Sequence, residues 1–241
     1  MRTKSIWGKP PSRLYNFKSL LQNKFGTDAR VCIVGASDGK FVLPFLRSGF
    51  HVTAYEVDEI AVYGGEKEFP IARTDIPIPK YVRNPAGNPI YHSVPSEMRH
   101  IQGLKLRAEL EQSDHLLTIK MKNFYREPPA ETYEAVFTSC SIPYPCNFDI
   151  PVSDIMGALM SSVSKGGYLC MDYMLPLEDC HNWRPEHYLR RGVVKKYLLK
   201  ADWKIIHLRE MSEPIFEAAH ADRPNDHFHR FGYVLAEHIS D

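Results

Sequence analysis

The sequence has little of what marks a protein that binds nucleic acid or spans a membrane. Its 30 Lys and Arg residues balance 29 Asp and Glu residues, which leaves a formal net charge of +1. Proteins that bind polyanions through charge carry a clear basic excess. No apolar run approaches the roughly 20 residues of a membrane-spanning helix, and the basic start, MRTKSIWGK, leads into Pro10 and Pro11 rather than into an apolar signal core. We therefore expect a soluble, cytoplasmic protein with a small-molecule partner, no nucleic acid and no membrane; homodimer formation is open.

Cysteine is scarce as well, and its number is odd. The five cysteines are Cys32, Cys140, Cys146, Cys170 and Cys180. Most of them stand in apolar, strand-like surroundings and none forms a CxxC pair, so a disulfide framework is not expected. His220, His227 and His229 lack a nearby thiolate and a helical spacing suited to zinc. We expect no metal site.

The most informative stretch runs from Arg30 to Asp58. It begins with an apolar run of the buried-strand type, turns at Gly35 and Gly39, and continues into a segment compatible with a helix. Residues 51–55 are predicted to form a second strand, with Glu56 at its carboxyl end. Strand, tight turn, helix and strand together predict a βαβ unit that binds a nucleoside-containing ligand.

The turn of this unit lacks glycines that a dinucleotide site needs. Ser37 stands where a middle glycine would, and no third glycine follows Gly39 to guard a pyrophosphate at the start of the helix. A ligand without phosphates is therefore favoured, and Gly35, Ala36 and Ser37 would approach it closely. Glu56 could accept both ribose hydroxyls; its alternative interpretation is an exposed acid at a strand end.

The remaining pattern predicts a single α/β domain over residues 1–241. Helices are expected at 12–26, 96–110, 154–163 and 187–203, the last interrupted at Gly192, and further strands at 116–121, 134–139, 168–171, 203–210 and 232–238. The fold class is a Rossmann-like, seven-stranded, mainly parallel sheet with antiparallel C-terminal edge strands and helices on both faces.

Two segments do not belong to this alternation of strands and helices. Residues 1–26, which contain Trp7, are predicted to be either a lid over the ligand or a helix that packs on the sheet. Residues 66–95 form a Pro-rich insertion of hairpin type, with NPAGNP at its middle. The insertion is either a substrate cap or an oligomerisation arm.

Polar and aromatic residues follow several predicted strands, where ligands bind in such sheets. Asn123 could hydrogen-bond an adenine edge and Phe124 could cover a ring face. Ser139, Cys140 and Tyr144 follow the fourth strand. The predicted ligand-binding residues are Gly35, Ala36, Ser37, Gly39, Glu56, Val57, Asn123, Phe124 and Ser139.

The sequence resembles the class I S-adenosylmethionine-dependent methyltransferases, and within them the tellurite-resistance and thiopurine-type branch. The resemblance lies in VCIVGASDGKFVLPFLRSGFHVTAYEVD, in the strand-end pair Asn123-Phe124, in SKGGYLCMDY, in WKIIHLRE with HFHRFGYVLAEH, and in the WGKPPS start. It covers most of 5–58 and 113–238 and implies S-adenosylmethionine as the cofactor. The chain departs from the family at Ile33, where an acid usually holds the methionine amino group, and at Ser37.

The resemblance implies methyl transfer to a small molecule, a reaction that needs few catalytic residues because the enzyme mainly holds donor and acceptor in line. Tyr144 and Tyr173 could face a cationic sulfonium, and Asp172 could act as a base or orient the acceptor. The runner-up is a cyclase or lyase that releases methylthioadenosine, which the departure at Ile33 motivates. A non-catalytic ligand-binding protein is the third interpretation, and a nicotinamide oxidoreductase is disfavoured by the loop.

Overall fold

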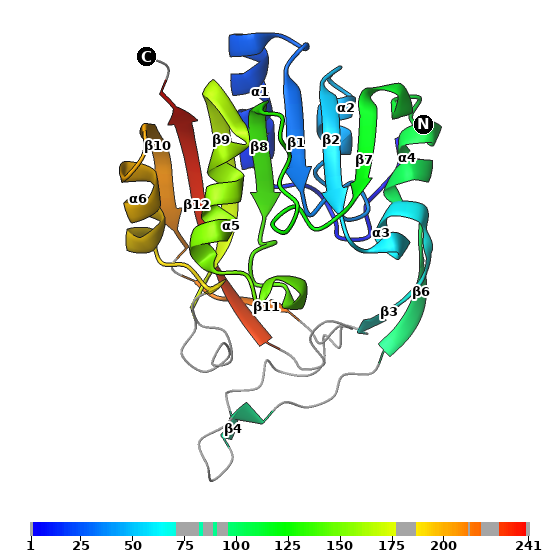
Figure 1. Ribbon diagram of the computed structural model, residues 1–241. Coiled ribbons are helices and arrows are strands. Elements are labelled where there is room, and N and C mark those ends of the chain that lie inside the picture. Colours follow the sequence, from blue (N-terminus) through cyan, green and yellow to red (C-terminus); the bar gives the residue numbers. More distant parts are fainter. Residues whose placement is uncertain are drawn as a thin grey trace.

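The computed structural model describes residues 2–70, 82–83, 89–90, 96–176, 187–211, 213–217 and 227–239. Within them, one twisted sheet carries helices on both faces (Figure 1). The strands of this sheet are β1 (Arg30–Val34), β2 (His51–Glu56), β7 (Leu117–Met121), β8 (Tyr133–Ser139), β9 (Val163–Leu175), β10 (Trp203–Glu210), β11 (Ile215–Glu217) and β12 (His227–His238). The helices are α1 (Ser12–Phe25), α2 (Leu43–Leu46), α3 (Glu59–Tyr63), α4 (Leu104–Leu110), α5 (Val152–Ser161) and α6 (Arg191–Leu199).

The strand order confirms the predicted Rossmann-like fold. It runs β10-β12-β9-β8-β1-β2-β7, and β11 pairs with β12 outside this path. The pairs from β9 through β8, β1 and β2 to β7 are parallel. Only β12 is reversed, because it is antiparallel to both β9 and β10. The carboxyl ends of β1, β2, β7 and β8 consequently meet at one edge of the sheet, which is where open α/β sheets bind ligands.

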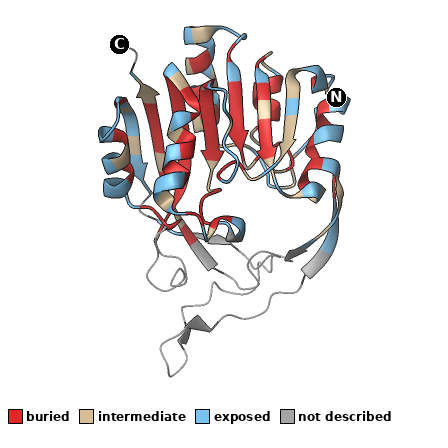
Figure 2. Cartoon of the chain, in the orientation of Figure 1, coloured by how far each residue is buried: buried red, intermediate tan, exposed pale blue. Residues whose placement is uncertain are grey.

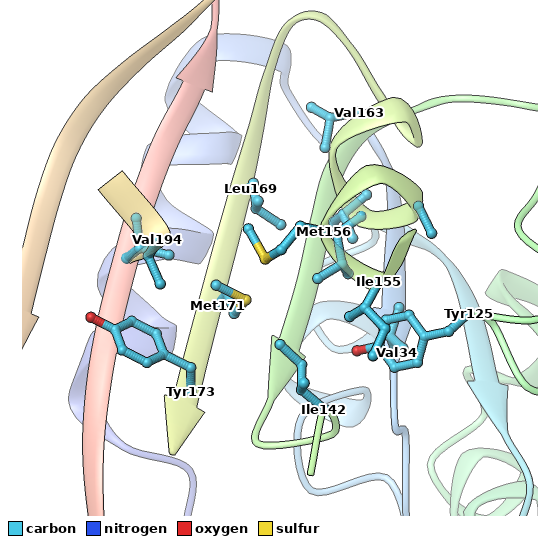
Figure 3. Packing of buried hydrophobic residues seen from close by; sticks show 14 of the residues in the cluster. Val34, Tyr125, Ile142, Ile155, Met156, Val163, Leu169, Met171, Tyr173 and Val194 are labelled. Carbon is cyan, nitrogen blue, oxygen red and sulfur yellow. The ribbon is translucent and has the colours of Figure 1, made fainter. Parts of the chain in front are cut away.

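Apolar residues fill both faces of the sheet, so β1 and β8 are buried on two sides (Figure 2). One cluster joins the sheet to α5 and α6, with Ile155 and Val194 among its members (Figure 3). The other joins it to α1, α2 and α4, through residues such as Phe17 and Phe45. Burial on both faces explains why these strands read as continuous apolar runs rather than as alternating ones.

The prediction of a helix from Ser96 is wrong. Residues Ser96–Ile101 form strand β6, which pairs antiparallel with β3 (Gly65–Pro70). Helix α4 begins only after Gly103, whose added Cβ would lie 2.3 Å from the backbone nitrogen of Gly64. The backbones cross so closely there that the chain must turn at Gly103, and pairing with β3 overrides the capping-box pattern at Ser96.

Strands β3 and β6 are the stem of the Pro-rich insertion. The stem leaves the sheet beside β7 and runs past the carboxyl ends of the strands (Figure 1). A short pair, β4 (Val82–Arg83) with β5 (Pro89–Ile90), lies further along the insertion. The other residues from 71 to 95 lie outside the described part of the chain, as do Cys180 and His220. The choice between a cap and an oligomerisation arm therefore stays a prediction.

Helices that are long and apolar enough to cross a membrane are not found among the described residues.

Tyr173 and Gly232 form a cross-strand pair whose geometry predicts a large effect of a small substitution. A Cβ on Gly232 would lie 2.0 Å from Cζ of Tyr173, which is fully buried. Gly232→Ala should lower the free energy of unfolding in urea by about 2 kcal/mol, because the ring has no space to move into. Gly157→Ala in α5 meets open space and should raise it by roughly 0.5 kcal/mol. Equal stabilities for the two variants would contradict the packing described.

Candidate functional site

A cavity of about 560 Å³ opens at the carboxyl ends of β1, β2, β7 and β8. Its wall is built by the loop from β1 to α2, by the residues that follow β2, β7 and β8, and by Trp7 from the N-terminal segment. Lys67 and Glu68 of β3 complete it. The cavity therefore stands where the topology predicts a ligand.

The loop after β1 keeps its turns through residues with positive φ. Gly35 has φ +73° and Gly39 has φ +90°. The positive φ favours glycine at residue 39, and a Cβ there would also lie 2.8 Å from Cδ1 of Leu104, which would have to move. Ser37, which stands in place of a glycine, has φ +49°. Its backbone N–H donates to Glu56 Oε2 at 2.6 Å, which stabilises this conformation.

Glu56 is the centre of the hydrogen bonds in this part of the cavity. Besides Ser37, the backbone N–H groups of Val57 and Asp58 donate to its Oε1 at 2.8 and 3.1 Å. A carboxylate offers about four acceptor positions, so it can still receive a hydroxyl. Glu56 is therefore held in a fixed orientation at the end of β2 and lines the cavity.

Asp58 joins this end of the cavity to the stem of the insertion, a link that sequence reasoning missed. Its Oδ1 accepts from the backbone N–H groups of Ile60 and Ala61 and so caps α3. Lys67 of β3 reaches its Oδ2 at 2.5 Å. Partial burial alone would raise the pKa of Asp58, but the hydrogen bond from Lys67 and the backbone donors lower it. The sequence signal for the capping role is the position of Asp58 directly before a short helical segment.

The residues after β7 lie at the cavity as predicted, but the amide of Asn123 is engaged. Its Nδ2 donates to Asn147 at 2.8 Å, and its Oδ1 accepts from the N–H of Tyr125 at 3.0 Å. Phe124 is buried against Tyr55, with ring centroids 5.1 Å apart and planes at 84°. The adenine contact of Asn123 stays a prediction, whereas Phe124 offers an apolar wall.

The residues after β8 form the opposite side of the cavity. Ser139, Cys140, Ser141 and Tyr144 all line it. Ser141 lies within a buried hydroxyl group network with Thr138 and Tyr125, and burial raises the pKa of Tyr125 to about 12. Tyr125 is consequently a neutral hydroxyl that supports the loop after β8 rather than an acid or a base.

Asp172 and Tyr173, two of the three predicted catalytic residues, are not among the residues that line the cavity. Asp172 is 1% exposed. Its carboxylate accepts hydrogen bonds from Nε and Nη2 of Arg13, at 2.8 and 2.6 Å, and from the Ser139 hydroxyl at 2.9 Å. It thereby joins α1 and β8 to β9. Tyr173 belongs to the apolar cluster beneath α6 (Figure 3). Tyr144 alone of the three lies at the cavity.

The N-terminal segment is tied to the loop by a buried carboxylate that sequence reasoning did not single out. Asp38, 1% exposed, accepts from the Ser5 hydroxyl at 2.7 Å and the Ile6 N–H at 3.0 Å. Arg107 of α4 forms an ion pair with it at 3.1 Å. Residues 2–26 thus divide into an irregular start, which brings Trp7 to the cavity, and helix α1, which packs on the sheet.

Thr3 is fastened to a second carboxylate. Glu111 accepts from the backbone N–H and the hydroxyl of Thr3, both at 2.7 Å, and from Arg47 at 2.6 and 2.7 Å. Only 4% of the Glu111 side chain is exposed. Burial alone would raise the pKa of Glu111, but the donors from Arg47 and Thr3 lower it to about 2.

Comparison with known proteins places this fold. No protein-family profile and no curated protein sequence matches the chain. Among solved structures, TehB from Haemophilus influenzae superposes with a TM-score of 0.61 at 13% identity over 95% of this chain and 62% of the TehB chain. The chain thus spans less than two thirds of TehB.

Two further structures carry methyltransferase names. Magnesium protoporphyrin IX methyltransferase (ChlM) from Synechocystis PCC 6803, crystallised with S-adenosylmethionine, has a TM-score of 0.57 at 12% identity, over 95% of this chain and 79% of ChlM. The N-methyltransferase NodS from Bradyrhizobium japonicum WM9 has a TM-score of 0.57 at 10% identity, over 95% and 96%. The chain has the Rossmann-like fold of class I S-adenosylmethionine-dependent methyltransferases, as the resemblance implied.

The Arg13–Asp172 pair predicts a strong coupling. Arg13→Leu should lower the free energy of unfolding by about 3 kcal/mol, because it leaves a buried carboxylate without its counterion. The Arg13→Leu/Asp172→Leu double variant should recover most of this loss, because no charge is then left unpaired. Urea unfolding at pH 7 measures both. Losses that simply add would show that the pair is not coupled.

Glu111 predicts a pH-dependent contribution of the N-terminal segment. Because its pKa in the folded protein is about 2, against 4.5 for the free side chain, it stabilises the fold above pH 4.5 and loses this effect as the pH falls toward 2. The contribution at pH 7 is about 3 kcal/mol. Urea unfolding of the wild type and Glu111→Gln between pH 7 and 3 should give a difference that shrinks with falling pH. A constant difference would contradict the assignment.

Proposed function

We propose that this protein is an S-adenosylmethionine-dependent methyltransferase that acts on a small molecule. One observation carries the proposal. The Glu56 carboxylate, oriented by three backbone N–H groups, lines a cavity of about 560 Å³ beside the positive-φ turn of β1. The carboxylate keeps about one acceptor position for a ribose hydroxyl, on a fold that methyltransferases share.

The residues of the cavity fit the parts of that donor. Glu56 would accept a ribose hydroxyl. Val57 and Phe124 would enclose the adenine, close to Asn123, which is predicted to contact the adenine edge. Gly35 and Ser37 line the cavity and would let the donor lie against the loop, and Ser139 would border its methionine end. Ala36 and Gly39, which were also predicted to bind the ligand, are buried and do not line the cavity. The cofactor supplies an electrophilic methyl group on a sulfonium.

The chain's own contribution to the reaction would be position rather than proton transfer. Tyr144 lines the cavity and could present its ring to the sulfonium charge. Asp172 is bound to Arg13 and Ser139 instead of facing the cavity, so the proposal needs an acceptor that is already nucleophilic. The insertion stem, which places Lys67 and Glu68 in the wall, would contribute to acceptor selection.

A reducing compartment fits this picture. Cys32 and Cys170 are buried, free thiols, and thiols are the usual state of cysteine in the cytoplasm. The proposal therefore includes a cytoplasmic location.

The runner-up is a cyclase or lyase on the same fold, which the departure at Ile33 motivates. Ile33, at the place of the usual acid, is fully buried in the apolar cluster that contains Phe17 and Phe45. Residue 33 therefore supplies no carboxylate to the methionine amino group. Cyclisation needs that amine free to attack.

Incubation with S-adenosylmethionine, with and without a panel of thiol, amine and hydroxyl acceptors, tests these functions. Mass spectrometry should find S-adenosylhomocysteine, formed only when an acceptor is present. Methylthioadenosine as the product would instead show a cyclase or lyase. No product together with no binding by calorimetry would refute both and leave the third interpretation.

Glu56→Gln tests the observation behind the proposal. It should weaken S-adenosylhomocysteine binding roughly 10- to 100-fold, because a hydroxyl loses a charged acceptor worth about 1.5–3 kcal/mol. Glu59→Gln, the nearby exposed acid that does not line the cavity, should bind like the wild type. Calorimetry measures both. Wild-type affinity in Glu56→Gln would contradict the ribose-binding role.

A further inference from the structure

Lys40 differs from Glu56 and Asp58, two acids of the cavity, in the kind of partner that its charged group has. Glu56 is held by backbone donors, and Asp58 is paired with Lys67. Lys40 lines the cavity and its Nζ donates to the Trp7 carbonyl at 2.9 Å. Among the residues that the structure describes, it forms no ion pair with a carboxylate.

Asp38 and Asp172, the carboxylates near Lys40, are already paired with other donors. Asp38 is occupied by Ser5, Ile6 and Arg107. Asp172 is occupied by Arg13 and Ser139. Burial lowers the pKa of Lys40, which means that its ammonium has already lost part of its hydration. An anion that enters the cavity would stabilise such a partly desolvated ammonium.

The strand order gives the position of Lys40 along a bound nucleoside. Glu56 and Phe124 follow β2 and β7, on one side of β1. Lys40 belongs to the loop after β1, and Ser139 and Cys140 at the end of β8 line the cavity on the other side of β1. A nucleoside with its ribose at Glu56 would therefore extend its 5′ substituent toward Lys40.

That substituent would meet the Lys40 ammonium, which lines the cavity in the loop after β1. Ile33 of β1 is fully buried and apolar and offers no charge to the ligand. The 5′ substituent of S-adenosylmethionine is an α-amino acid, with one ammonium and one carboxylate. Charge complementarity at this end selects the carboxylate.

We propose that Lys40 is the anchor for the donor's carboxylate, and that this site recognises the carboxylate rather than the amine. The inference rests on the proposed function, because it takes the ligand to be S-adenosylmethionine. It assigns Lys40 a role in binding specificity and leaves the methyl transfer itself unchanged.

Calorimetry with three nucleosides tests the assignment. The probes are S-adenosylhomocysteine, its decarboxylated analogue, which keeps the amine, and 5′-methylthioadenosine, which has neither group. The wild type should bind S-adenosylhomocysteine roughly 10- to 100-fold more tightly than the decarboxylated analogue, as expected for a charge-assisted hydrogen bond. Lys40→Met should abolish this preference but keep the affinity for 5′-methylthioadenosine. Lys40→Arg should restore the preference in part.

Lys105→Met is the matched control, because Lys105 is exposed on α4 and does not line the cavity. It should keep the full preference for the carboxylate. An unchanged preference in Lys40→Met, or no preference in a wild type that binds 5′-methylthioadenosine, would overturn the inference alone. Failure of the wild type to bind any of the three nucleosides would overturn the proposed function, and the inference with it.

Discussion

The hydrogen bond from the Ser37 N–H to Glu56 is the contact on which the cavity depends. It joins the turn after β1 to the end of the neighbouring strand β2, at 2.6 Å. A serine at positive φ would otherwise be strained, and the Oε2 atom of Glu56 would lose its backbone donor. The hydrogen bond thereby fixes Ser37 and Glu56 relative to each other, and both residues line the cavity.

Three buried carboxylates connect the segments around this loop. Asp38 holds the N-terminal segment and α4, and Glu111 holds Thr3 and Arg47. Asp172 holds α1 against β9. In each case a carboxylate buried in the protein is matched by several donors, so the cost of its desolvation is offset. Lys40, by contrast, donates to the Trp7 carbonyl at the cavity rather than to one of these carboxylates.

Much of the framework could be predicted from residue patterns. The strands at β1, β2, β8 and β10 and the helix α1 follow from apolar periodicity, and Gly35, Gly39 and Glu56 follow from the βαβ unit. The stretch from Ser96 could not be predicted in this way. A capping-box pattern is a local preference, and pairing with β3, which lies far away in sequence across the insertion, outweighed it.

The sequence by itself determined the Rossmann-like fold, the edge of the sheet at which a ligand would bind and the carboxylate of Glu56, because these depend on periodicity and on residues close together in the chain. Only the tertiary structure decided the surroundings of the other charges. It turned Asp172 toward Arg13, 159 residues away, and Asp38 toward Ser5 and Arg107, and it brought Lys40 to the cavity. Partners so distant in sequence leave no local pattern, because they meet only when the sheet and its helices have packed.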